Sequence, residues 1–231
     1  MFITKEMLIE KDARKRDIEW FEEYFPNGGD YQEVLDLTGK HCESYFGIWA
    51  LKRFGPMDTV LEVDELISTH SIIFAGRIIS KGNININGNL IVGRNIKAGG
   101  YIKTSGDIQA SRNIKAGRYI EVGKRVEANR YIKAGGYIEA DWGIYSGRYI
   151  KAGGDIKTNG WIRTNRYIIA GGYIEADTTI IVGEGIEAGG SIYAGKGIKT
   201  GGNILNFSNF SGSGLKPGEI FIPNSKEKGE C

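Results

Sequence analysis

The chain has 231 residues, of which 41% are hydrophobic and 25% are charged. These values are ordinary for a globular protein and exclude a disordered or fibrous chain, and two cysteines are too few for a disulfide framework or a cysteine-rich zinc site. Because no apolar run is as long as a membrane span and the charged N-terminus is unlike a signal peptide, we expect a soluble, cytoplasmic protein without a membrane segment.

Glycine content and charge distribution both depart from the average. The 35 Gly against 4 Pro amount to about twice the usual glycine content, without the strict triplet of collagen. Residues 1–71 carry 8 Lys and Arg against 15 Asp and Glu, whereas residues 72–206 carry 19 against 10. This division predicts an acidic N-terminal part and a basic body with separate roles.

Residues 1–58 predict a small helical cap. The pattern of residues 5–25 indicates one charged amphipathic helix, which the segment 26–30 would end. Asp30 is suited to capping a second helix over 31–39, and a third helix over 43–54 would stop at Gly55 and Pro56. We expect this cap to cover the N-terminal end of the structure that follows and the outward side chains of Ile73, Ile79 and Ile91.

A six-residue repeat then decides the fold. Every sixth residue from Ile72 to Ile204 is aliphatic, and all 23 are Ile except Leu90 and Val126. A small residue follows two positions later, so both side chains point to the same face of a short strand. The next residue is usually Gly, Asn, Ser or Asp, for which we expect left-handed backbone at a corner. This pattern predicts a parallel β-helix over residues 59–206, with Val60 and Leu66 already in phase.

The outward side chains repeat every 18 residues, which indicates three hexapeptides in each coil of a triangular prism. Residues 72–206 would then form 7.5 coils, about 36 Å long at the usual strand spacing. The columns that show this period are Arg94, Arg112, Arg130, Arg148 and Arg166; Lys97, Lys115, Lys133 and Lys151; Asn95, Asn113, Tyr131, Tyr149 and Tyr167; and Tyr101, Tyr119 and Tyr137.

The hexapeptide units resemble those of two families. Hexapeptide acyltransferases share the six-residue unit and triangular coils, but their catalytic His lies at a coil interface, and the repeat here contains no His. Bactofilin-like cytoskeletal proteins also form triangular β-helices, which polymerise end to end. The Gly-Tyr-Ile-Lys-Ala-Gly repeat and the segment from Phe25 to Tyr31 are also similar to repeat proteins of bacteria and phages, and this resemblance implies a compact binding fold such as phage-borne CRISPR inhibitors use.

The Arg, Lys and Tyr columns form the most pronounced surface feature, and two interpretations of them remain open. In the structural one, Arg guanidinium groups stack on Tyr rings, the rings stack on one another, and the corners become stiffer. In the functional one, the columns bind a phosphate backbone, exposed bases or an acidic protein. We name this candidate site the basic stripe: Arg94, Arg112, Arg130, Arg148, Arg166, Lys97, Lys115, Lys133, Lys151, Tyr131, Tyr149 and Tyr167. We expect Glu121, Glu139 and Glu175 on another face.

The sequence gives no basis for a catalytic, metal or cofactor site. The neighbouring His41 and Cys42 and the single His70 do not have the spacing of a nucleophilic pair or of metal ligands. We therefore predict a non-enzymatic macromolecular binding protein, in its narrowest form a phage-type, anti-CRISPR-like inhibitor of a nucleic-acid-processing defence complex. The partner would be a protein or a protein–nucleic-acid complex, with contact to the nucleic-acid backbone. The alternatives are a self-assembling structural protein of bactofilin type and, third, a hexapeptide acyltransferase.

Residues 207–231 lose the repeat and are expected to form a C-terminal tail or cap. Large apolar side chains gather in the sequence near this end, and exposed apolar patches are usually covered. We therefore expect a homodimer through an interface that contains Ile169, Ile181, Leu205, Phe207 and Phe210.

Overall fold

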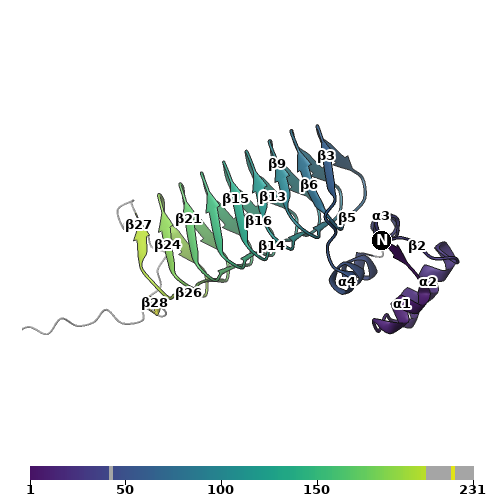
Figure 1. Ribbon diagram of the computed structural model, residues 1–231. Coiled ribbons are helices and arrows are strands. Elements are labelled where there is room, and N and C mark those ends of the chain that lie inside the picture. Colours follow the sequence, from purple (N-terminus) through teal and green to yellow (C-terminus); the bar gives the residue numbers. More distant parts are fainter. Residues whose placement is uncertain (42–43, 207–219, 222–231) are drawn as a thin grey trace, which may run out of the picture.

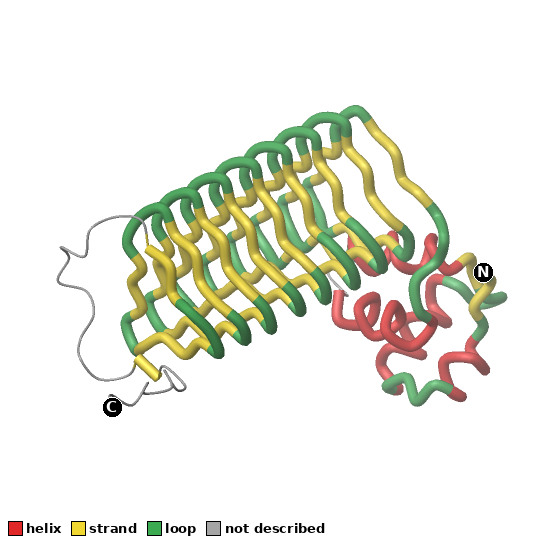
Figure 2. Tube along the Cα trace, turned by 60° about the vertical axis from the view of Figure 1, so that its left-hand side comes forward, coloured by secondary structure: helices red, strands yellow, loops and turns green. Residues whose placement is uncertain are grey.

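The computed structural model describes residues 1–41, 44–206 and 220–221 and shows a rod with a helical block at its N-terminal end (Figure 1). The rod is a parallel β-solenoid of about 8 turns with 18 residues per turn, which confirms the predicted fold class. From β3 to β27, each strand pairs in parallel with the strand three places along the chain, so the strands form three long sheets, one on each face of the prism (Figure 2).

We name the three sheets by the side chains on them. The Lys sheet contains β3 (Val60–Val63), β6 (Arg77–Ser80), β9 (Ile96–Ala98), β12 (Ile114–Ala116), β15 (Tyr131–Ala134), β18 (Tyr149–Ala152), β21 (Tyr167–Ala170), β24 (Gly185–Ala188) and β27 (Ile204–Asn206). The Glu sheet contains β4 (Leu66–Ser68), β7 (Ile84–Ile86), β10 (Ile102–Thr104), β13 (Ile120–Val122), β16 (Ile138–Ala140), β19 (Ile156–Thr158), β22 (Ile174–Ala176) and β25 (Ile192–Ala194).

The third sheet, the cap sheet, carries the helices at its N-terminal end. It contains β5 (Ile72–Phe74), β8 (Leu90–Val92), β11 (Ile108–Ala110), β14 (Arg125–Ala128), β17 (Gly143–Ser146), β20 (Trp161–Thr164), β23 (Thr179–Val182), β26 (Gly197–Thr200) and β28 (Ile220–Phe221). Strand β28 pairs in parallel with β26, so part of the expected tail continues this sheet.

The repeated aliphatic side chains fill the interior of the prism. Ile114, Ile132 and Ile150 lie opposite one another in successive strands, and all three are fully buried. The small residues two positions later, such as Ala134, are also buried and leave room for the isoleucines of the other two sheets. A fully buried Ile stabilises the fold by roughly 1.5–3 kcal/mol relative to an exposed one, so the stacked isoleucines of the three sheets contribute strongly to the stability of the solenoid.

Most corner glycines of the solenoid are needed for a reason that differs from our expectation, since only Gly88 and Gly197 among the described ones have a positive φ. Left-handed backbone was expected there, but among the described residues outside glycine only Asp12 has a positive φ, and Gly135 does not. Instead, a Cβ on Gly135 would collide with the backbone carbonyl oxygen of Gly117 in the coil before. Close stacking of successive coils, and not a special backbone conformation, therefore excludes a side chain at this corner.

The first coil is one residue shorter than the others, which corrects the predicted phase. Leu61, and not Val60, lies opposite Ile78 in the register of β3 and β6. Leu61 packs against the core, whereas Val60 is exposed. The next strand returns to the 18-residue register, since Leu66 pairs with Ile84 as predicted.

The helical block has four helices where the sequence predicted three. The expected helix over 5–25 is two helices, α1 (Lys5–Glu10) and α2 (Lys15–Tyr24), because Asp12 takes a left-handed conformation between them. A two-stranded antiparallel sheet of β1 (Phe2–Ile3) and β2 (Gly29–Asp30) ties the N-terminus to the block.

The other two helices agree closely with the prediction. Asp30 caps α3 (Tyr31–Lys40) by accepting hydrogen bonds from the backbone N–H groups of Gln32 and Glu33, at 2.8 and 3.4 Å. Helix α4 (Ser44–Phe54) ends before Gly55, whose φ of +83° suits a glycine at a helix C-terminus.

Helix α3 covers the edge of the cap sheet. The side-chain amide of Gln32 donates to the carbonyl oxygen of Ile73 and accepts from the N–H of Ala75, both at 2.9 Å. The helices bury Ile73 and Ile91 in a second core, as predicted, but Ile79 lies on the Lys sheet and is outside this core. The helical block therefore caps one sheet of the three.

We expect Ile132→Asp to abolish folding of the solenoid or to lower its unfolding free energy by several kcal/mol, because the carboxylate would have no partner in the interior. The neighbouring Lys133→Asp is the matched control, since Lys133 points outward, and it should cost far less. Chemical denaturation followed by circular dichroism measures both changes. A larger loss in Lys133→Asp than in Ile132→Asp would contradict the inward assignment of the isoleucines.

Candidate functional site

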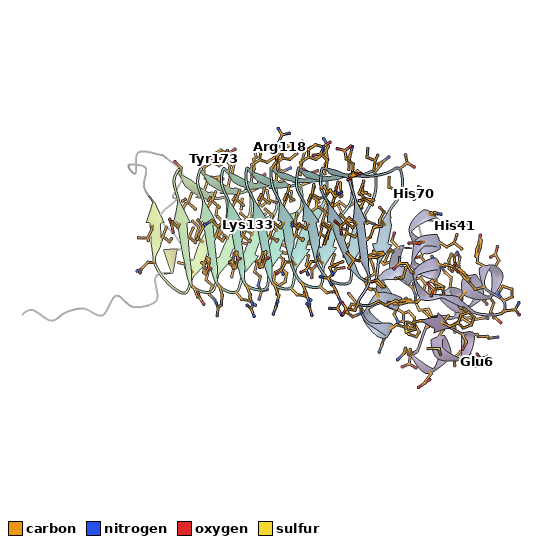
Figure 3. All side chains as sticks on the ribbon, turned by 45° about the horizontal axis from the view of Figure 1, so that its top comes forward. Glu6, His41, His70, Arg118, Lys133 and Tyr173 are labelled. Carbon is orange, nitrogen blue, oxygen red and sulfur yellow. The ribbon has the colours of Figure 1, made fainter. Side chains whose placement is uncertain are left out.

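The lysines of the basic stripe lie in one row on the outer surface of the Lys sheet. Lys97, Lys115, Lys133 and Lys151 are paired in successive strands, so each lies about 4.8 Å from the next. Lys133 lies at mid-length of the solenoid (Figure 3). Among the described residues, no carboxylate lies within ion-pair distance of these four lysines.

The arginines form a second row at the corner before each strand of the Lys sheet. Their backbones make a continuous ladder in which each N–H donates to the carbonyl oxygen of the arginine one coil earlier, at distances of 2.7–3.1 Å. Only the ends of the row carry ion pairs, Arg94 with Asp58 at 3.5 Å and Arg166 with Glu184 at 3.5 Å. The three middle side chains are exposed and have no carboxylate partner among the described residues: Arg112, Arg130 and Arg148.

Tyrosines occupy the row between the arginines and the lysines. The ring centroids of Tyr131 and Tyr149 are 5.1 Å apart and those of Tyr149 and Tyr167 are 5.3 Å apart, with planes within 8° of parallel. Burial and the adjacent tyrosines raise the pKa of Tyr149. The predicted stacking of Tyr rings is thus present, but the predicted stacking of Arg on Tyr is not found among the described residues, where cation–π contacts involve only Lys11 and Lys124.

The outer surface of the Glu sheet differs because most charges in its outer row have an ion-pair partner. Lys103 lies 2.7 Å from Glu121 and Lys157 lies 3.8 Å from Glu175, while Glu139 is opposite Lys157 in the register. The three predicted glutamates therefore lie on a separate face, as expected. A second column of stacked rings, Tyr101, Tyr119 and Tyr137, lies beside them at spacings of 5.0 and 4.8 Å.

The three described residues of the predicted dimer interface lie on two different sheets. Ile169 and Leu205 both point outward from the Lys sheet, separated by Glu187. Ile181 belongs to the outer row of the cap sheet, between Arg163 and Lys199. Phe207 and Phe210 lie outside the described residues. The dimer itself stays a prediction.

The sequence does not predict the surface hollows of the described residues, and two of these hollows lie beside features described above. One, of about 560 Å³, lies between α4 and the cap sheet and is lined by residues that include Ile48, Lys52, Ile91 and Arg125. The other, of about 420 Å³, lies on the Lys sheet beyond Tyr167, where Gly185 interrupts the tyrosine row. The second could have been found in the sequence, because the 18-residue period places Gly185 directly after the three tyrosines.

No group of three or more His, Cys, Asp or Glu in the described part of the chain could hold a metal ion. His70 is exposed, with one ring nitrogen 3.2 Å from the hydroxyl of Thr69, and the His41 ring packs edge-on against Tyr24. No helix in the described ranges is long and apolar enough to cross a membrane. Comparison of the chain with protein family models, curated proteins and solved structures found no match.

The tyrosine column on the Glu sheet predicts a loss of stability at alkaline pH. Burial and the charge of Glu121 raise the pKa of Tyr137 to about 12, and its hydroxyl donates to Glu121 at 3.3 Å. An unfolded tyrosine has a pKa of about 10, so between about pH 10 and 12 the folded chain keeps a proton that the unfolded chain has lost, and the unfolding free energy falls as the pH rises.

Tyr137→Phe should make this fall shallower, and Glu121→Gln should lower the pKa of Tyr137 by removing the neighbouring charge. Chemical denaturation at several alkaline pH values, with tyrosinate absorbance as a second readout, measures both effects. Identical pH dependence in the wild type and in Tyr137→Phe would show that Tyr137 titrates alike in the folded and unfolded chains.

Proposed function

We propose that the protein is a non-enzymatic binding protein that holds a single-stranded nucleic acid along the basic stripe. The observation that carries this proposal is the row of unpaired cations. Seven side chains of the stripe have no carboxylate partner among the described residues, and all lie on one side of the prism: Lys97, Lys115, Lys133, Lys151, Arg112, Arg130 and Arg148.

The spacing of these cations carries an electrostatic cost that a polyanion would offset. Two unit charges about 4.8 Å apart repel by roughly 0.9 kcal/mol in water before screening by salt. The Glu sheet has the same strand spacing but offsets its lysines with glutamates, such as Lys103 with Glu121. The fold therefore permits charge pairing on a face, and its absence from the Lys sheet favours an external anion.

A single strand fits the stripe better than a duplex or an isolated phosphate. The four lysines span about 14 Å along one straight row, which matches several consecutive phosphates of one strand. The faces of the tyrosines beside them are stacked on one another, so the row of cations, and not base stacking along the row, carries the affinity for the strand. A rigid, straight rod of this kind would keep processing enzymes away from the bound strand, and on this basis we propose the narrower role of an inhibitor of a nucleic-acid-processing complex.

A structural role of bactofilin type is the second candidate. It needs solenoid ends that can stack on one another, and Gln32 already occupies the edge of β5 at the N-terminal end. Filaments of the full chain in electron micrographs would favour this candidate over a binding protein.

The decisive experiment reverses the three middle arginines. Because a single strand gives a salt slope near −0.7 per contacted phosphate, seven cations predict a slope of about −5 for the wild type. The triple variant Arg112→Glu, Arg130→Glu and Arg148→Glu should bind a fluorescent oligonucleotide far more weakly, with a slope no steeper than about −3. Its thermal stability should change little, since these side chains are exposed and unpaired.

The matched control reverses Arg125, Arg163 and Lys199 on the cap sheet, which changes the net charge by the same amount on another face. It should keep most of the affinity and the wild-type salt slope. Equal losses in the two triple variants would mean that only net charge matters, and unchanged binding in both would remove the stripe from the proposed function.

A further inference from the structure

The tyrosine row of the Lys sheet ends at an open ring face. Tyr131 and Tyr149 each have a ring stacked on the side nearer the C-terminal end of the solenoid, but Tyr167 is paired there with Gly185, which has no side chain. The next coil places Asn203 one position before Ile204, so no aromatic ring resumes the row. Among the described residues no ring stacks on this face of Tyr167, which can therefore receive a planar group.

The space above this ring is the hollow of about 420 Å³, which we name the Gly185 notch. Gly185 and Ile186 form its floor, and Ile169 and Leu205 contribute apolar side chains from the outer row, where Leu205 is 55% exposed. Its volume lies in the lower part of the range for small-ligand sites. The remaining lining residues are Tyr167, Ile168, Glu184, Glu187 and Asn203.

The notch begins where the cations of the stripe stop. The outer row changes from Lys151 to Ile169 and then to Glu187, and the arginine row ends at Arg166, which is paired with Glu184. A phosphate backbone that follows the lysines therefore loses its support at this coil. The apolar and aromatic lining of the notch suits the base of the next nucleotide and not its phosphate.

We propose that the Gly185 notch receives the terminal base of the strand that the basic stripe holds, stacked on the free face of Tyr167. This inference rests on the proposed function and adds a base-binding site to it. Stacking of bases on aromatic side chains is tolerant of sequence, so Tyr167 supplies affinity for an unpaired base of any kind.

The carboxylate of Glu187 adds a preference among bases. Glu187 is half-buried and lies in the outer row between the two apolar side chains of the notch. A carboxylate accepts hydrogen bonds from an exocyclic amino group such as that of cytosine, whereas thymine presents carbonyl oxygens on both sides of its single N–H. We therefore expect a terminal base with an amino group to bind more tightly than thymine.

The test uses thymidine oligonucleotides of about twelve residues that carry cytosine or thymine at one end, with each end tried in turn. The wild type should prefer a terminal cytosine at one of the two ends by about tenfold. Tyr167→Leu should weaken binding of every strand and reduce the preference, while leaving the salt slope set by the lysines unchanged. Glu187→Gln should remove the preference for cytosine and keep most of the affinity.

Gly185→Tyr is the complementary variant, because a fourth tyrosine would fill the notch. Its Cβ would lie 2.9 Å from the carbonyl oxygen of Asn203, so a small shift of the last coil is needed, and circular dichroism must confirm the fold. A preference for cytosine that survives in both Tyr167→Leu and Gly185→Tyr overturns the notch as the base site. Salt-dependent binding with no preference for cytosine at either end would overturn the base site in the notch but leave the proposed nucleic-acid binding in place. Absence of binding to any oligonucleotide would overturn both the base site and the proposed function.

Discussion

Stacking of identical coils in register is the constraint on which the whole structure depends. Beyond the first coil, the buried aliphatic side chains lie on the aliphatic residue 18 positions earlier, and backbone N–H groups at the corners donate to carbonyl oxygens of the neighbouring coil. A slip of one residue would turn the buried side chains outward and the charged ones inward. Packing of the core therefore fixes the register of the strands. Once the register is fixed, outward side chains that are 18 residues apart lie next to one another in rows.

The alignment of outward side chains into rows follows from this constraint, but the residue types in each row do not. The Glu sheet shows that a row can alternate in sign, since Lys103 and Glu121 pair across adjacent strands. The Lys sheet keeps one sign over four strands under the same geometry. Repetition of a coil explains why like residues align but does not explain why the two sheets differ in charge, and the anion that we propose as a ligand would account for this difference.

The parts of the structure that depend on the repeat could be predicted from the sequence. The spacing of six identifies the strands, and the spacing of 18 places Lys115 beside Lys133 and Tyr131 beside Tyr149.

The features that could not be predicted from the sequence depend on single contacts. The break between α1 and α2 rests on the backbone of Asp12, and the shortened first coil moves Leu61 into the place expected for Val60. Among the described residues no arginine stacks on a tyrosine of the Lys sheet, where the rings of Tyr131, Tyr149 and Tyr167 stack on one another instead.

The uniform coil also makes the molecule modular in length. Gly117 and Gly135 occupy equivalent corners and each lies against the backbone carbonyl oxygen of the glycine one coil earlier, so coils can be added or removed without a change in the packing of these corners. Duplication or loss of 18 residues would lengthen or shorten the rod by one step of about 4.8 Å. The same event would add or remove one rung from every surface row at once. Recombination within the gene could thus change the length of the row that contacts a ligand by one coil at a time. The helical block at the N-terminal end would not change.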